Sequence, residues 1–427
     1  MHDRSMSGSA GTRTLSTRVS IALLVLVALS YVTNAMDRSL YPQLVPYINQ
    51  HYRFSLGQGG FLATIFALGM GVGGLPAGYL IDRMSRKSVT IIGIFIYSLF
   101  TLLNAYANSF WDLASYRVLT GVGEALQQTA LFAMVGTFFY RYRTAAIGAL
   151  NAAYGIGAFL GPVAGMQLFL ATGERWQIPL IAFGAIGLVF CVVFWVLVPR
   201  LFSEAQGLAG ATGHRPVEDH LPARLATRNL VLVSIANVMV GLSTFGYLGL
   251  YPTFLKTSLH FSTASTALCA SMYGVGAFMG LPAGFIGDKL NQKRVILAAA
   301  FGSMVVYLLM FSFVRTAGGQ ALLSLLQGVC ASGFLFVNIY SLTQRSVRHQ
   351  FLGRSSGVAS SAHYLPAAFS GMLLGWMVGH LDWGLAAIIQ LGVFPALAIG
   401  AMLLFDYSMT SRLVIHEPSS SEVLSAT

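Results

Sequence analysis

Four charged residues lie inside stretches that are otherwise apolar, and they are the first candidates for chemistry in this sequence. Arg117 and Glu124 stand seven residues apart in the run from Trp111 to Phe139, a spacing that puts both on one face of a helix, about 10.5 Å apart. Asp37 and Arg38 are neighbours in another apolar run. A guanidinium binds a carboxylate through two parallel hydrogen bonds and stays charged at any working pH. These side chains therefore suit the binding of an organic anion.

The two acids add a second function. Charged side chains inside hydrocarbon are costly unless they face a partner or a wet cavity. A substrate anion that takes an arginine away from its carboxylate partner favours protonation of that carboxylate, which couples the anion to a proton. We therefore predict that Arg38 and Arg117 bind the substrate and that Asp37 and Glu124 carry or gate the proton. The alternative is a structural salt-bridge network that only holds the two helices together.

The composition is that of a membrane protein. Of 427 residues, 56% are hydrophobic and 9% are charged, whereas a soluble domain carries about 25% charged residues. The mean hydropathy is +0.70. The net charge of +11 comes from small basic clusters between apolar runs, a distribution that orients a membrane protein. We predict an all-α protein in the lipid bilayer, with no nucleic-acid partner.

Apolar runs long enough to cross a bilayer, about 20 residues each, recur along the chain. The twelve expected spans are 18–49, 57–81, 88–107, 111–140, 144–171, 178–199, 229–252, 262–287, 295–314, 319–344, 355–380 and 384–406. The first is long, so we expect it to project beyond the bilayer or to bend near Pro42 and Pro46. The predicted domains are a tail at 1–17, a six-helix bundle at 18–199, a linker at 200–228, a six-helix bundle at 229–406 and a tail at 407–427.

Lysine and arginine are distributed unevenly between the two sides of these spans. With the N-terminus in the cytoplasm, 19 of the 25 lie on the cytoplasmic side, and the opposite side holds Arg53, Arg175, Lys256 and Arg315. Positive charge is enriched in cytoplasmic loops, so we predict that both termini are cytoplasmic. The short loops and the absence of a recognisable targeting segment fit a multi-pass protein of the plasma membrane, the inner membrane in a bacterium.

An internal repeat indicates how the spans are organised. The segment Gly74–Gly78 recurs 206 residues later as Gly280–Gly284. The same register matches the charged residues that follow, Asp82 with Asp288 and Lys87 with Lys293. Two six-helix halves related by a parallel repeat predict a substrate site between them, near the middle of the membrane.

These features resemble the major facilitator superfamily over nearly the whole chain. The loop from Gly78 to Lys87 is similar to the signature of that superfamily between helices 2 and 3, with Ser85 where a glycine is usual, and the copy from Gly284 to Lys293 is looser. The resemblance implies two six-helix bundles and a gating role for the loops. The residues concerned are Gly78, Asp82, Arg83, Arg86, Lys87, Gly284, Asp288, Lys289 and Lys293. The alternative is that these loops only set the topology.

The fifth span carries small residues at spaced positions. They are Gly148, Gly157, Gly161, Pro162 and Gly165. Spaced glycines let helices approach closely, and a proline within a span bends it. The pattern resembles the glycine-proline motif described mainly in exporters of the superfamily, and simple packing is an equal alternative.

The charged residues resemble two groups within the superfamily. Asp37-Arg38 combined with Arg117 and Glu124 looks like the anion:cation symporter group, and the segment Gly121–Ala125 is similar to the spinster-like group. Both resemblances imply proton-linked roles for the two acids, and the first implies anion binding by the two arginines.

Polar and aromatic residues on the two spans that carry the charged residues, and on other spans, are further candidates for substrate binding. They are Asn34, Tyr41, Gln128, Asn151, Tyr154, Tyr247, Asn338 and His363. Those of the second half suit hydroxylated or aromatic substrates. For Asn151 and Tyr154 packing is an equal alternative. His363 fits either a satisfied structural histidine or a proton carrier.

We therefore predict a secondary active transporter that moves a small organic anion, such as a sugar acid or an aromatic carboxylate, together with protons by alternating access. The alternative is a proton-coupled antiporter that exports a drug or an amphiphilic, lipid-like substrate. The sequence contains no nucleotide-binding loop, nucleophile elbow or metal-ligand spacing. We expect no enzyme, no metal and no cofactor besides the proton as coupling ion, and a monomer. A sensor is disfavoured because the segment after residue 406 is short.

Overall fold

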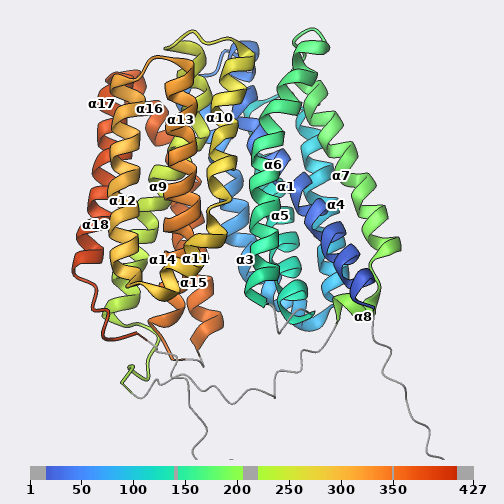
Figure 1. Ribbon diagram of the computed structural model, residues 1–427. Helices are drawn as coiled ribbons and strands as arrows, with labels where there is room; N and C mark the ends of the chain where they lie inside the picture. Colours follow the sequence, from blue (N-terminus) through green and yellow to red (C-terminus); the bar gives the residue numbers. More distant parts are fainter. Residues whose placement is uncertain (1–15, 139–142, 205–219, 349–350, 411–427) are drawn as a thin grey trace, which may run out of the picture.

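The computed structural model describes residues 16–138, 143–204, 220–348 and 351–410. Its regular elements in these ranges are helices (Figure 1). Those of the first half are α1 (Thr17–Tyr52), α2 (Leu56–Thr64), α3 (Phe66–Arg83), α4 (Arg86–Asn104), α5 (Phe110–Phe138), α6 (Arg143–Ala171), α7 (Gln177–Leu197) and the short α8 (Arg200–Ser203). The first expected span is one continuous helix of 36 residues that contains both of its prolines.

The second half contains more interruptions than the first. Its elements are α9 (Arg228–Thr257), α10 (Thr263–Ala277), α11 (Gly280–Lys289), α12 (Gln292–Leu308), η2 (Leu309–Phe313), α13 (Ala317–Gln327), η3 (Gly328–Phe336), α14 (Val337–Arg345), α15 (Leu352–Ala367), α16 (Ser370–His380), α17 (Trp383–Ala387), η5 (Ile388–Val393) and α18 (Phe394–Leu403). Each of the twelve expected spans falls on one helix or on consecutive helices, which confirms the all-α fold. Nine helical stretches in the described ranges are long and apolar enough to cross a membrane.

Polar residues stand at the start of many of these helices, as the polar segments between the apolar runs predict. Ser55 and Gln58 form a capping box at the start of α2, and Asp382 accepts a hydrogen bond from the backbone N–H of Leu385 at the start of α17. Such side chains satisfy N–H groups that the first turn of a helix leaves without partners. The helix starts are therefore encoded locally, by single polar residues.

The two halves stand side by side and meet along helices from each (Figure 1). α6 packs against α10, α2 against α16, α3 against α15, and α1 contacts α9. Close packing along these seams depends on glycine. Gly155 of α6 lies against Gly274 of α10, and Gly60 of α2 lies against Gly371 of α16.

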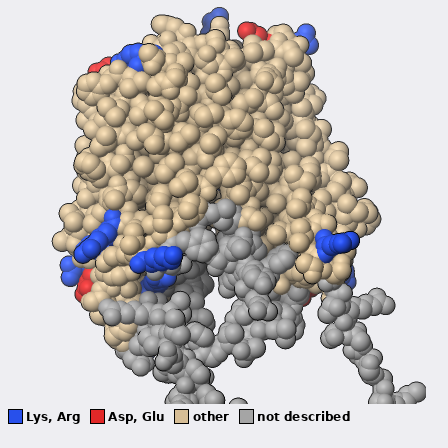
Figure 2. Space-filling model, in the orientation of Figure 1, with Lys and Arg blue, Asp and Glu red and all other residues tan. Residues whose placement is uncertain are grey.

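The surface agrees with a membrane-embedded protein. Figure 2 shows lysine, arginine and acidic side chains near the two ends of the bundle, with a broad band of uncharged residues between them. Large apolar side chains such as Trp195 and Phe301 are exposed in the described structure. Exposed apolar surface of this extent marks contact with lipid.

Several hydrogen bonds between the halves lie toward the end of the bundle opposite the start of α1, here called the far end. Thr64, the last residue of α2, donates its hydroxyl to the carbonyl of Ala368 at 2.8 Å and accepts from the backbone N–H of Gly371 at 3.3 Å. It thereby satisfies backbone groups that the break between α15 and α16 frees. Tyr47 Oη lies 2.8 Å from Thr263 Oγ1 across the same interface. These bonds hold the halves together at the far end.

The contact of Gly60 with Gly371 gives a test of this closure. A methyl group added at Gly371 would lie 2.1 Å from the carbonyl oxygen of Gly60, whereas one added at Gly379 of the same helix meets nothing within 4 Å. We expect Gly371→Ala to widen the distance between spin labels at 53 and 315, on opposite halves, because overpacking costs about 1–3 kcal/mol. Gly379→Ala should leave that distance unchanged. Equal distributions in both variants would contradict the closure.

Candidate functional site

Arg38 and Glu124 form a buried ion pair between α1 and α5. Arg38 Nε donates to Glu124 Oε2 at 2.9 Å, and both side chains are buried. The second carboxylate oxygen, Glu124 Oε1, has no hydrogen-bond partner in the described part of the chain. Breaking such a pair is costly because the remaining charge stays buried without compensation. The pair therefore strongly links the charge states of its two members.

A relay of amide groups holds Arg38 from the other side. Arg38 Nη2 donates to Asn34 Oδ1 at 3.2 Å, and Asn34 Nδ2 donates to Gln127 Oε1 at 2.8 Å. Gln127 Nε2 in turn donates to the carbonyl of Ser30 at 3.1 Å. Ser30, Asn34 and Arg38 follow one another at one-turn spacing in α1, so they share a face. The relay fixes the guanidinium in place against α5.

Asp37 bonds to α4 rather than to either arginine. Thr101 Oγ1 donates to Asp37 Oδ2 at 2.8 Å, and both side chains are buried. Asp37 and Arg38 are adjacent in sequence, so their side chains leave α1 in directions about 100° apart. The two acids therefore have different partners, a hydroxyl for Asp37 and a guanidinium for Glu124.

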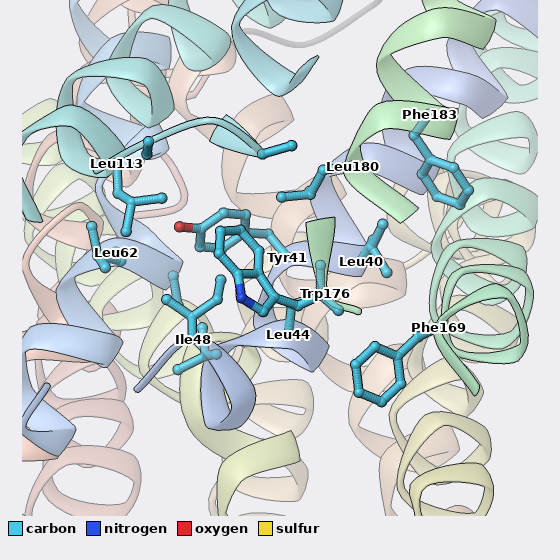
Figure 3. Packing of buried hydrophobic residues seen from close by; sticks show 14 of the residues in the cluster. Leu40, Tyr41, Leu44, Ile48, Leu62, Leu113, Phe169, Trp176, Leu180 and Phe183 are labelled. Carbon is cyan, nitrogen blue, oxygen red and sulfur yellow. The ribbon is translucent and has the colours of Figure 1, made fainter. Parts of the chain in front are cut away.

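Arg117 lies between two aromatic rings. Its Cζ is 4.2 Å from the ring centroid of Tyr41 and 4.8 Å from that of Phe66. Figure 3 shows Tyr41 packed with Leu44 and other apolar residues of the same cluster. Arg117 Nε and Nη2 have no hydrogen-bond partner among the described residues. The positive charge is thus stabilised by ring faces, with donor groups left over.

Phe66 connects the two arginines. Its ring centroid is 4.8 Å from Arg117 Cζ and 5.7 Å from Arg38 Cζ. Gly121 makes this possible, because a methyl group there would lie 1.9 Å from the carbonyl oxygen of Phe66. Gly123 packs α5 against α4 in the same way, because a methyl group added there would meet the backbone nitrogen of Tyr97. The Gly-Val-Gly segment therefore brings neighbouring helices close enough to assemble the site.

Two adjoining cavities lie between the halves. One, of about 590 Å³, is bordered by α1, α2, α3, α6, α9 and α10. The other, of about 690 Å³, is bordered mainly by α5, α6, α9, α10, η3 and α15. Tyr154, Phe245, Leu248 and Tyr273 border both. The cavities therefore form a central chamber near the middle of the helices, where the repeat predicts the substrate site.

The structure divides the predicted binding residues into two sets. Those that border the central chamber are Arg38, Gln128, Asn151, Tyr154, Tyr247 and His363. Those that lie behind the lining, all of them buried, are Asn34, Asp37, Tyr41, Arg117, Glu124 and Asn338. Arg38 joins the two sets, because it borders the chamber and also bonds to Asn34 and Glu124. Their roles in binding and coupling remain predictions.

His363 has one of its ring nitrogens satisfied. His363 Nδ1 lies 3.0 Å from Asn237 Oδ1, and Asn237 Nδ2 donates to the carbonyl of Ala359 at 2.7 Å. Since Asn237 offers an acceptor, Nδ1 carries the proton and donates. The ring borders the chamber, so the structure leaves room for either of its expected roles.

The glycines of α6 pack against α1. Methyl groups added at Gly157 and Gly161 would lie 2.4 Å from the carbonyl of Val32 and 2.3 Å from the hydroxyl of Ser39, and one at Gly165 would press on Leu40. Pro162 borders the chamber. The surroundings of Gly148 lie outside the described residues. The spaced glycines thus let α6 approach the helix that carries Arg38.

The two loop lysines in matching repeat positions make different contacts. The backbone N–H of Lys87 donates to Glu204 Oε1 at 3.2 Å. Lys293 Nζ donates to the carbonyls of Leu403 and Phe405 at 2.9 and 2.7 Å, which caps the end of α18. The repeat therefore conserves position but not the contact.

The other loop residues are described only in part. Arg83 and Lys289 are exposed, Arg86 is half-buried, and Gly284 has nothing within 4 Å of an added methyl group. The side chains of Asp82 and Asp288 and the surroundings of Gly78 lie outside the described residues. The gating role of both loops stays a prediction.

The sequence analysis missed three residues of the site. Gln127 stands beside the predicted Gln128, and its spacing of three from Glu124 was a usable signal. Thr101 and Phe66 come from helices that no pattern connects with Asp37 or Arg117. Long-range packing of α3 and α4 against α5, which itself contacts α1, brings them in.

The fold and the central chamber together define a membrane transporter, and comparison with known proteins identifies its family. The sequence profile of the Major Facilitator Superfamily matches residues 27–233 and again 233–424. A hexuronate transporter of Bacillus subtilis is 24% identical over 404 residues, covering 89% of this chain and 93% of the relative. A gallate transporter of Pseudomonas putida is 26% identical over 420 residues, covering 90% and 87%.

A solved structure shows the same fold. It is that of a bacterial homologue of the human lysosomal transporter Spinster, with a TM-score of 0.73, 17% identity, and coverage of 93% of this chain and 98% of that one. The chain belongs to the Major Facilitator Superfamily, as its two profile matches show.

Adjacent glutamines test the amide relay. Gln127→Leu leaves Asn34 Nδ2 buried without an acceptor, which we expect to lower the free energy of unfolding by about 1–3 kcal/mol. Gln128→Leu is the matched control, because Gln128 borders the chamber and its side chain makes no hydrogen bond within the described part of the chain. Thermal unfolding of both purified variants measures the difference. A relay without structural importance would give the two variants equal melting temperatures.

The ion pair can be tested by a double-mutant cycle. Arg38→Met leaves Glu124 buried without its cation, and we expect a loss of about 3–5 kcal/mol at neutral pH. Adding Glu124→Gln removes the stranded charge and should recover part of that loss. The readout is unfolding of the detergent-solubilised protein. Additive effects of the two substitutions would show that the pair is not coupled.

Proposed function

We propose that this transporter moves a small organic anion together with protons by alternating access. The observation that carries the proposal is the position of Arg38, which borders the central chamber while its Nε bonds to the buried Glu124. Arg38 is the one formally charged side chain among the described residues that line the chamber. A chamber that presents a cation and no carboxylate favours an anionic substrate. Related transporters of hexuronate and gallate, both organic acids, support this substrate class.

The proton enters through competition for Arg38. A substrate carboxylate that binds the guanidinium from the chamber side weakens the contact of Arg38 with Glu124. A buried carboxylate without its cation is stabilised by taking up a proton. Glu124 Oε1 has no hydrogen-bond partner in the described structure and offers a place for that proton. Binding of the anion and protonation of Glu124 are then linked, and the linkage is reciprocal.

Arg117 and Asp37 form the second part of the proposed mechanism. Arg117 has unused donors, and Asp37 is held by Thr101 on α4. Buried donors without acceptors call for a partner in another state of the molecule. We assign that partner to Asp37 or to the carboxylate of the substrate, reached when α1 and α5 change their relative position.

The described conformation fits one stage of the transport cycle. The proposed orientation, from the excess of lysine and arginine at the end where the chain begins, places the far end outside the cell. Thr64 and Tyr47 join the halves there, so this form is closed toward the outside. Opening requires these contacts to break while others form at the cytoplasmic end.

The chamber also favours a ring-shaped substrate. Aromatic side chains from both halves surround it, among them Tyr31, Tyr154, Phe245, Tyr273, Phe336 and Tyr364. Aromatic faces stack on sugar rings and aromatic rings alike, and tyrosine hydroxyls can bind the hydroxyl groups of either. The proposed substrates are therefore sugar acids and aromatic carboxylates.

A second candidate function is the proton-coupled export of an amphiphile. The supporting observation is an apolar groove at the far end, bordered by Leu56, Phe61, Trp111 and Trp376, with about 960 Å³ of space. An acyl chain fits such a surface. Arg38 in the chamber argues against a lipophilic cation as the cargo, because like charges repel.

Ligand-induced stabilisation separates the two functions. We expect an organic acid among galacturonate, galactonate and gallate to raise the melting temperature of the purified protein, because a ligand at 100 times its Kd stabilises the folded state by about 2.7 kcal/mol. Arg38→Met should abolish the shift, and the matched control Arg53→Met, at the far end, should keep it. A shift that persists in Arg38→Met would refute the assignment. Stabilisation by long-chain amphiphiles alone would favour export.

A further inference from the structure

A second cation lies between the central chamber and the far end. Lys256 stands in the last turn of α9 and is half-buried. Its Nζ lies 3.1 Å from Thr263 Oγ1 and 5.7 Å from the ring centroid of Tyr47. No described carboxylate lies within ion-pair distance of it. A half-buried ammonium that bonds to a neutral hydroxyl retains attraction for an anion.

Lys256 borders a small cavity of its own. The cavity, with about 180 Å³ of space, is also lined by Gln43, Tyr47, Thr263 and Thr266. Gln43 Oε1 and Thr266 Oγ1 are buried and have no hydrogen-bond partner in the described chain. Gln43 also borders the central chamber. The small cavity therefore lies next to the chamber, with Gln43 bordering both, and contains unused polar groups beside a cation.

The same hydroxyl that binds Lys256 also joins the two halves. Tyr47 Oη of α1 and Thr263 Oγ1 of α10 are 2.8 Å apart. When the far end opens, the halves separate and this bond breaks. Thr263 and Lys256 then become available to a ligand at the moment when the path to the outside exists.

We propose that Lys256, with Thr263, Thr266, Tyr47 and Gln43, forms an outer binding station for the transported carboxylate. An acid that enters from outside meets it before Arg38, and an acid that leaves meets it last. The ammonium and the hydroxyls donate to the carboxylate, and Gln43, which borders both cavities, donates to it through Nε2 as it moves into the chamber. This inference rests on the anion transport and the orientation proposed above.

The station predicts an effect on one face of the membrane only. Initial rates of uptake of radiolabelled galacturonate and gallate are measured in intact cells, where the substrate arrives from outside. They are also measured in inside-out vesicles, where it arrives at the cytoplasmic face. Lys256→Met should raise the KM from outside about three- to tenfold, the loss of one charge-assisted contact in a half-wet site. The KM from the cytoplasmic face should stay within twofold, and Lys256→Arg should retain the wild-type KM. Arg315→Met, another cation of the far end, is the matched control and should have no effect.

A second variant keeps the test decisive if Lys256→Met fails to fold. Thr266→Val removes a hydroxyl that has no hydrogen-bond partner in the described chain. It should raise the KM from outside about twofold. An unchanged KM from outside in Lys256→Met overturns the station, and so does an equal rise from both faces. In either case, loss of transport in Arg38→Met preserves the proposed function. If the wild-type chain neither binds nor moves either acid, anion transport fails and the station fails with it.

Discussion

The ion pair between Arg38 and Glu124 is the interaction on which the rest of the site depends. Both groups are buried, so neither charge is stable there without the other. Of the two residues, only Arg38 borders the chamber. A ligand in the cavity can therefore change the charge state of Glu124 through Arg38 without touching Glu124. The amide relay from Ser30 and the ring of Phe66 hold Arg38 in contact with Glu124 and at the border of the chamber. In the proposed mechanism the pair serves coupling rather than stability.

The internal repeat shows how the halves have diverged. Pro46 and Pro252 are 206 residues apart, as are Tyr41 and Tyr247, so α1 and α9 share a framework. The charged positions of α1 do not follow it. Arg38 corresponds to Thr244 in the second half, a neutral residue that also borders the chamber.

The second half contributes other groups to the chamber. Tyr41 stacks on Arg117, whereas Tyr247 bonds to Ser324. The segment η3 has π-helical geometry and occupies the repeat position of the part of α5 that contains Glu124. The first half therefore supplies the formal charge that borders the chamber, while both halves supply aromatic and hydroxyl groups. This division fits the proposed substrate, with a carboxylate at one end and a ring at the other.

Much of this arrangement could be predicted from the sequence, because it depends on the lengths of apolar runs and on residue spacing within single helices. The twelve expected spans follow from apolar runs, and the shared face of Arg117 and Glu124 follows from helical spacing. The sequence did not predict which side chains these charged residues contact. Arg117 and Glu124 share a face of α5, yet Glu124 bonds to Arg38 while Arg117 rests on aromatic rings.

That choice of partners depends on how four helices pack. The contacts of Thr101 with Asp37 and of Phe66 with both arginines span distant parts of the chain, and no periodicity encodes them. The two loop lysines show the same limit, since equal repeat positions lead to different contacts. Spacing within one helix predicts which residues share a face, and only tertiary packing decides what that face meets.

The central claim is that a substrate carboxylate and Glu124 compete for Arg38. Proton uptake on ligand binding tests it most directly, measured with a pH indicator in weakly buffered solutions of the purified protein as the binding acid is added. The account predicts that the wild-type protein takes up protons as the acid binds, and that Glu124→Gln binds the acid with much reduced uptake. Binding without proton uptake in the wild-type protein, or equal uptake in the variant, would contradict the account.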